Sequence, residues 1–202
     1  MARNRAHQLV VYEAALDEPA TDGAYTVLHG RAVPYGAWTN RGWFMESVRG
    51  GAFDKSIEEA PEGLPLLLFH NDEMLPIGLS REWDSKPDGL HGVWDLDLGE
   101  TAQTAARYAR DGLLRWFSVG HTPIRSEWEM VDPAEWDPDK GPEYMDHVTR
   151  IEARLLETSL VTTPAFATAQ VKLVRSTEGL RQRQERRPSL RSWQAWRAGL
   201  TE

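Results

Sequence analysis

Three polar side chains stand in surroundings that suit nucleophilic and acid–base chemistry. His70 directly follows an apolar segment, residues 64–69, so its imidazole can be anchored on one side and wetted on the other, as a general base requires. Ser118 lies among large apolar residues and close to Gly120, which would let a substrate backbone approach. Many loop histidines and strand serines only form hydrogen bonds to neighbouring residues. The residue types therefore leave both a catalytic and a structural role open.

Glu157 is the third candidate, because it is a carboxylate inside an otherwise apolar and hydroxylated segment, residues 155–161. A charge in such a strand needs a partner. That partner is either an arginine, in a structural ion pair, or an imidazole that the carboxylate orients, as the third member of a serine triad does. Ser118 lacks the Gly-x-Ser-x-Gly motif, which excludes the nucleophile elbow of the α/β-hydrolases.

Other chemistries find little support in the sequence. The chain has no Cys, which excludes a disulfide framework, a thiolate zinc site and a cysteine nucleophile. His121 and His147 could join His70 around a metal, but no His-x-His or His-Glu-x-x-His spacing is present. No glycine-rich phosphate-binding motif occurs either. We therefore expect neither a metal nor a cofactor.

The charge is unevenly distributed along the 202 residues. The net charge of −8 argues against general affinity for nucleic acid. From Lys172 onward, however, eight basic residues face three acidic ones, so this end carries +5 and the rest −13. No apolar run approaches the roughly 20 residues of a membrane helix, and no secretory signal pattern opens the chain, so we expect no membrane association.

Hydrophobic patterning predicts one strand-dominated domain over residues 1–175. Residues 126–147 hold eight acidic side chains and three prolines, typical of an exposed loop or hairpin. Residues 176–202 are rich in Arg and Gln and predict a basic, mobile tail. A short helix capped by Asp54 and a longer one with alanines at helical spacing are expected over 55–59 and 100–114. Strands are predicted over 8–12, 25–34, 64–69, 89–98, 116–122 and 151–162.

Several short motifs also follow one another in a specific order. They occupy residues 30–35, 46–53, 69–78, 117–120 and 157–165. The most specific are Ser-Val-Gly at Ser118 and Glu-x-Ser-Leu-Val-x-x-Pro-Ala at Glu157. In this order the chain resembles the prohead maturation protease family of tailed bacteriophages, from about Gly30 to Val171.

The resemblance implies a serine endopeptidase related to the herpesvirus assemblins. The implied fold is α+β and strand-dominated, a closed and mainly antiparallel β-barrel with peripheral helices. By the family's motifs, His70 takes the place of the base, Ser118 that of the nucleophile and Glu157 that of the third residue. His147 is the alternative third residue, because related viral proteases use a second histidine. His121 departs from the family's usual aromatic, and strand alternation should turn it away from Ser118.

The resemblance also implies partners and a place of action. The substrates would be the major capsid protein with its scaffold region, and the protease itself; a homo-oligomer is left open. The protease would act in the host cell cytoplasm, inside the assembling prohead. The alternative is a catalytically inactive assembly factor with the same fold. A nucleic-acid-binding module built on the basic tail is a weaker alternative, opposed by the acidic body.

Overall fold

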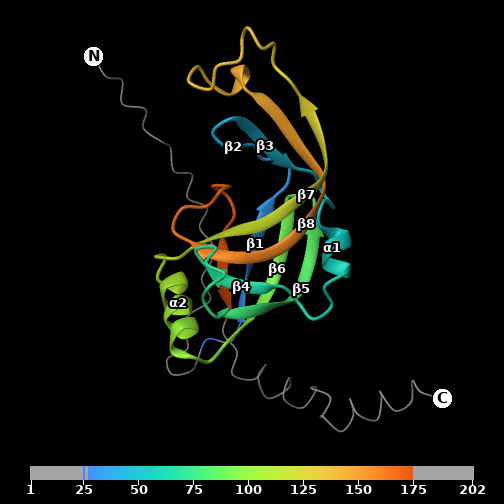
Figure 1. Cartoon of the computed structure of the whole chain (residues 1–202). Coiled ribbons are helices and arrows are strands. Elements are labelled where there is room, and N and C mark those ends of the chain that lie inside the picture. Colours follow the sequence, from blue (N-terminus) through green and yellow to red (C-terminus); the bar gives the residue numbers. More distant parts are fainter. Residues whose placement is uncertain (1–24, 26, 175–202) are drawn as a thin grey trace, which may run out of the picture.

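The computed structural model describes residue 25 and residues 27–174. Within this range one nine-stranded sheet carries two helices and a single 3-10 turn at Pro142–Tyr144 (Figure 1). Neither helix is long and apolar enough to cross a bilayer. The helices are α1 (Asp54–Glu58) and α2 (Glu100–Arg110). The strands are β1 (Val27–Pro34), β2 (Thr39–Asn40), β3 (Phe44–Val48), β4 (Pro65–Leu68), β5 (Gly78–Lys86), β6 (Gly89–Leu96), β7 (Trp116–Glu129), β8 (Asp146–Val161) and β9 (Val171–Val174).

Strand β8 is the central strand of the sheet and pairs with three others, β3, β4 and β7. The strand order is β2-β3-β8-β4-β5-β6-β1-β9, and β7 pairs antiparallel with β8 along the other edge. The first part of β8 pairs with β3 and its last part with β4, both parallel. Between them α1 takes the place of a strand, because Ser56 Oγ accepts a hydrogen bond of 3.0 Å from the N–H of Leu155. β8 therefore positions four different elements along its length.

The expected closed barrel is wrong, because the sheet curls without closing. In the described part of the chain no ladder joins β9 to β7. Only the isolated bridge between Trp116 and Gln170, and N–H to carbonyl bonds such as that from Phe117 to Ala169 at 3.2 Å, span the gap. The physical reason is that β9 has only four residues and pairs with β1, so at the edge of β7 only the segment before β9 meets Trp116 and Phe117. The distal halves of β7 and β8 pair with each other, β3 pairs with that part of β8, and the two strands project as a long hairpin (Figure 1).

The core lies inside the curl. Trp94 and Phe117 are fully buried and stack with ring centroids 4.4 Å apart. Strand β6 alternates buried and half-buried residues as expected of a strand with one face on the core. Helix α2 buries four alanines, Ala102, Ala105, Ala106 and Ala109. These small side chains let the helix pack closely against the sheet.

Several predicted elements agree with the structure in kind but not in extent. The helix predicted over 100–114 ends at Arg110, and the strands predicted over 116–122 and 151–162 are the inner parts of the longer β7 and β8. The sequence did not predict strands β2, β3, β5 and β9. Asp54 was expected to cap α1, but it is the first helical residue and Phe53 occupies the N-cap position. The strand predicted over 8–12 and the predicted tail over 176–202 lie outside the described residues.

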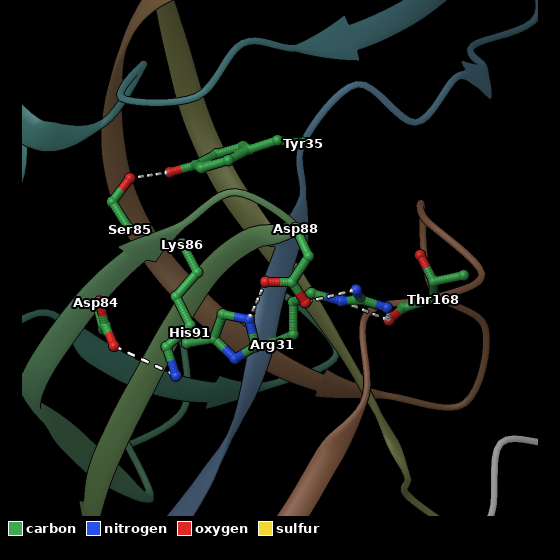
Figure 2. A network of polar contacts seen from close by, with 8 residues as sticks. All are labelled: Arg31, Tyr35, Asp84, Ser85, Lys86, Asp88, His91 and Thr168. Atoms are coloured by element: carbon green, nitrogen blue, oxygen red, sulfur yellow. Dashed lines mark hydrogen bonds and ion pairs between the residues drawn. The ribbon is translucent and has the colours of Figure 1, made fainter.

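The motif at residues 30–35 has a structural role. Arg31 forms an ion pair of 3.0 Å with Asp88, which also bonds His91 (Figure 2). The Arg31 guanidinium also donates two hydrogen bonds to the carbonyl oxygen of Thr168, at 2.8 and 3.2 Å. Arg31 thus joins the turn between β5 and β6 to the segment that leads into β9.

Gly30 should be intolerant of any side chain. A Cβ at this position would collide with the carbonyl oxygen of Gln170 and lie 2.9 Å from the Phe117 ring. Gly30→Ala should therefore cost about 1–3 kcal/mol, and each kcal/mol should lower the melting temperature by roughly 2–4 °C. The control is Gly50→Ala, where the nearest atom is at an ordinary 3.5 Å. Thermal unfolding by circular dichroism should separate the two variants, and equal melting temperatures would contradict this account.

Candidate active site

A strained turn presents His70 at the end of β4. Phe69 and His70 both adopt left-handed backbone conformations, each with φ of 58°. Non-glycine residues rarely do so, and each costs on the order of 1–3 kcal/mol. The turn is held by hydrogen bonds from the N–H of Phe69 to the Leu160 carbonyl at 3.1 Å and from Asn71 to Leu68 at 3.0 Å. The pairing of this turn with β8 therefore stabilises the strained conformation.

The imidazole of His70 is bonded to the carboxylate of Glu157. His70 Nδ1 lies 2.7 Å from Glu157 Oε1, and because a carboxylate only accepts, Nδ1 carries the proton. This leaves the lone pair on Nε2 of the neutral ring. The carboxylate is 12% exposed and the imidazole 42% exposed. The carboxylate is thus largely shielded, while the imidazole remains accessible to a substrate.

Ser159 holds both partners of this pair. Its hydroxyl donates to Glu157 Oε2 at 2.7 Å and accepts the backbone N–H of His70 at 3.0 Å. One buried side chain therefore orients the carboxylate and anchors the strained turn. The sequence analysis assigned Ser159 no role. The available signal was its spacing of two residues from Glu157, which puts both on one face of a strand.

Ser118 lies on the same face of the sheet as Glu157 and Ser159. In the β7–β8 ladder Ser118 is directly opposite Ser159, and Gly120 is opposite Glu157. Directly opposed residues have Cβ atoms about 4.5–5.5 Å apart, so the Ser118 side chain is close to this cluster. Within residues 27–174 no hydrogen bond joins Ser118 to the His70 ring. Such bonds often tighten only when substrate is bound.

Gly120 provides the space for the Glu157 side chain. A Cβ on residue 120 would lie 2.5 Å from Glu157 Oε1 and 3.1 Å from its Cγ. The sequence analysis attributed this glycine to the approach of a substrate backbone. The structure gives a different reason: without a side chain at residue 120, the carboxylate can lie over β7 and reach His70.

The alternative third residue, His147, lies elsewhere. It is ten residues from Glu157 along β8, a separation of roughly 30 Å in an extended strand. Its ring contacts Trp38 edge-on, with centroids 4.8 Å apart. The structure thus brings His70, Ser118 and Glu157 together and leaves His147 on the distal hairpin.

A second buried carboxylate, Glu46, lies on the core side and is paired with arginine. Glu46 is 2% exposed, and its oxygens lie 2.7 Å from Arg150 Nε and 3.0 Å from Arg41 Nε. His121 is also there, with Nε2 3.8 Å from Glu46 and its ring edge-on to Phe53. Burial lowers the pKa of His121, which opposes its protonation. His121 therefore lies on the opposite face from Ser118, as strand alternation predicts.

The electrostatics of His70 follow from its bond to Glu157. That hydrogen bond is the main cause that raises the pKa of His70 above its ordinary 6.5, while partial burial acts in the opposite direction. The protonated ring is thus stabilised by the carboxylate. An imidazole with this property can take up a proton from a neighbouring hydroxyl and hold it.

A serine, a histidine and a carboxylate are the three types of side chain that a serine protease triad combines. The chain belongs to the caudovirus prohead serine protease family, whose model matches residues 12–183 of the 202. The family's activity is capsid maturation in tailed bacteriophages.

Solved structures of similar fold include two of Kaposi's sarcoma-associated herpesvirus protease. One, in complex with a hexapeptide phosphonate inhibitor, is 12% identical, with a TM-score of 0.44 over 83% of this chain and 72% of that chain. The other, in complex with an allosteric inhibitor, is 13% identical, with a TM-score of 0.41 over 78% and 80% of the two chains. The search of curated proteins found no match.

Ser159→Ala should impair the site far more than the fold. The change frees Glu157 Oε2 and the N–H of His70, so the reaction rate of Ser118 with a fluorophosphonate probe should fall at least tenfold. The matched control is Ser85→Ala in β5, which removes one hydrogen bond of 2.8 Å with Tyr35, the residue after β1. We expect this control to react like the wild type. Equal rates in Ser159→Ala and Ser85→Ala would contradict a positioning role for Ser159.

Proposed function

We propose that the protein is a serine endopeptidase that processes capsid and scaffold proteins during prohead maturation. The observation that carries this proposal is the 2.7 Å contact between His70 Nδ1 and Glu157 Oε1, with Ser118 on the same face of the sheet. Family membership supports a capsid maturation protease. The arrangement of the three side chains supplies the chemistry.

In the proposed mechanism the Ser118 hydroxyl attacks the carbonyl carbon of the scissile peptide bond. His70 takes the hydroxyl proton on Nε2 and then donates it to the leaving amine nitrogen. Glu157 holds the ring in the tautomer with the proton on Nδ1 and stabilises the imidazolium. Water, deprotonated by the same Nε2, then attacks the acyl-enzyme, and Nε2 returns the proton to the Ser118 oxygen as its bond to the second product breaks. No cofactor is needed for these steps.

The proposed substrates are the major capsid protein with its scaffold region, and the protease itself. Membership of the family supports an association with capsid proteins and action within the assembling prohead in the host cell. The alternative, a catalytically inactive assembly factor, would share the fold and the capsid partner. The two functions differ in whether Ser118 reacts.

Co-expression with the capsid protein of the same phage tests this function. Ser118→Ala removes one oxygen and should leave the melting temperature within about 2 °C, yet processing of both chains should be abolished. Ser85→Ala is the matched control and should process normally. Intact-mass spectrometry of both chains reads out cleavage. Processing that persists in Ser118→Ala would remove Ser118 from the mechanism, and absence of processing in the wild type would favour the inactive assembly factor.

A further inference from the structure

A cavity of about 660 Å³ lies beside the candidate active site. Helix α2 and the loop that follows it form one wall, including Thr104, Tyr108 and Leu113. Leu68 and Phe69 at the end of β4 form the opposite wall with Thr162. Phe69, Tyr108 and Leu113 are all exposed, so the cavity is open to solvent. Its volume is within the range of small-ligand sites and exceeds that of a single large side chain.

The cavity is lined by residues that lie near the candidate catalytic groups along the chain. Phe69, in its wall, directly precedes His70 in the chain. Thr162 follows Ser159 by three residues, about 10 Å along an extended strand, and Ser159 is directly opposite Ser118. An extended peptide bound at Ser118 advances about 3.3 Å per residue. A side chain within about three residues of the scissile bond can therefore reach the cavity.

The backbone of Phe69 supports a functional role for this wall. Phe69 has φ of 58° and is 54% exposed, so the fold bears strain to hold a large apolar ring at the surface. Because the Phe69 ring is exposed, its burial in the core does not account for the strained backbone. The same strained turn directs His70 to Glu157 and supplies Phe69 to the cavity. Backbone strain of this kind is concentrated at functional sites.

We propose that this cavity is a specificity subsite that accepts a large apolar side chain of the substrate within three residues of the scissile bond. The inference rests on the proposed protease function. The chemistry of the occupant follows from the walls, since six of the ten lining residues are leucine, phenylalanine, tyrosine or alanine, and the other four are three threonines and Glu100. A pocket of this kind distinguishes a large apolar side chain from alanine by about tenfold or more.

A filled-cavity variant tests the subsite. Thr104→Phe places a ring in the cavity from α2, and the matched control Arg107→Phe adds the same ring at an exposed position of α2 outside the cavity. The full chains would first be incubated with a peptide library made by digesting a whole proteome, and mass spectrometry would locate the cleavage sites. Two synthetic peptides that differ only at the preferred position, leucine or phenylalanine against alanine, would then give the ratio of kcat/KM.

The wild type and Arg107→Phe should prefer the large apolar peptide at least tenfold, and in Thr104→Phe the ratio should fall to about one. If circular dichroism shows that Thr104→Phe is unfolded, Leu113→Ser replaces it as the test, because Leu113 is an exposed residue of the wall. In Leu113→Ser the ratio of kcat/KM for the two peptides should fall at least threefold. A wild-type ratio in the folded variant overturns the subsite. The subsite is also overturned if Thr104→Phe changes the molar mass measured by light scattering but leaves the ratio of kcat/KM unchanged. That result would show that a second copy of the chain covers the cavity.

The same experiment separates the subsite from the proposed function. A wild-type chain that cleaves library peptides without an apolar preference within three residues of the cut contradicts the subsite alone. A wild-type chain that cleaves no peptide, and whose Ser118 takes up no fluorophosphonate, contradicts the proposed protease and the subsite with it.

Discussion

The hydrogen bond between Glu157 and His70 is the interaction on which the site depends. It joins β8 to the turn after β4, and the elements around it are arranged to allow it. Gly120 leaves room for the carboxylate, and Ser159 bonds both the carboxylate and the backbone of His70. Ser118 lies opposite Ser159 on β7. The pairing of β8 with β4, which is parallel, and with β7, which is antiparallel, thus brings together His70, Ser118 and Glu157. These residues are 39 to 87 positions apart in the sequence.

The two carboxylates near the β7–β8 pair, Glu46 and Glu157, have different partners. On the core side Glu46 binds Arg150 and Arg41, so these guanidinium groups are already paired with a carboxylate. On the other face Glu157 bonds an imidazole. A buried carboxylate that lost its partner would be costly, so each face needs its own cation or donor. Arg150 and Arg41 pair with Glu46, although Arg41 is still near enough to His70 to lower its pKa. Glu157 bonds His70 rather than an arginine, which was the structural alternative for that residue.

The sequence singled out the candidate groups but not their supports. Ser118, His70 and Glu157 were picked out together by the order of the family's motifs, because each residue alone left a structural role open, and their catalytic roles stay predictions. Strand alternation correctly turned His121 to the other face. The roles of Ser159 and Gly120 depend on the register of β7 against β8, and that of the turn at Phe69 on the parallel pairing of β4 with β8. Register and long-range pairing are tertiary properties that local periodicity does not contain. The open curl, in place of the expected barrel, is likewise a matter of long-range pairing, since β9 pairs with β1 and forms no ladder with β7 among the described residues.

The most direct test of the central claim is the pKa of His70, measured by nitrogen-detected NMR titration of the full chain and of Glu157→Gln. Because the hydrogen bond to Glu157 is the main cause of the raised value, the wild-type pKa should lie above 6.5 and should fall in Glu157→Gln. The wild-type ring nitrogens should also show the proton on Nδ1 in the neutral form. A wild-type pKa at or below 6.5, or one that Glu157→Gln leaves unchanged, would contradict the account.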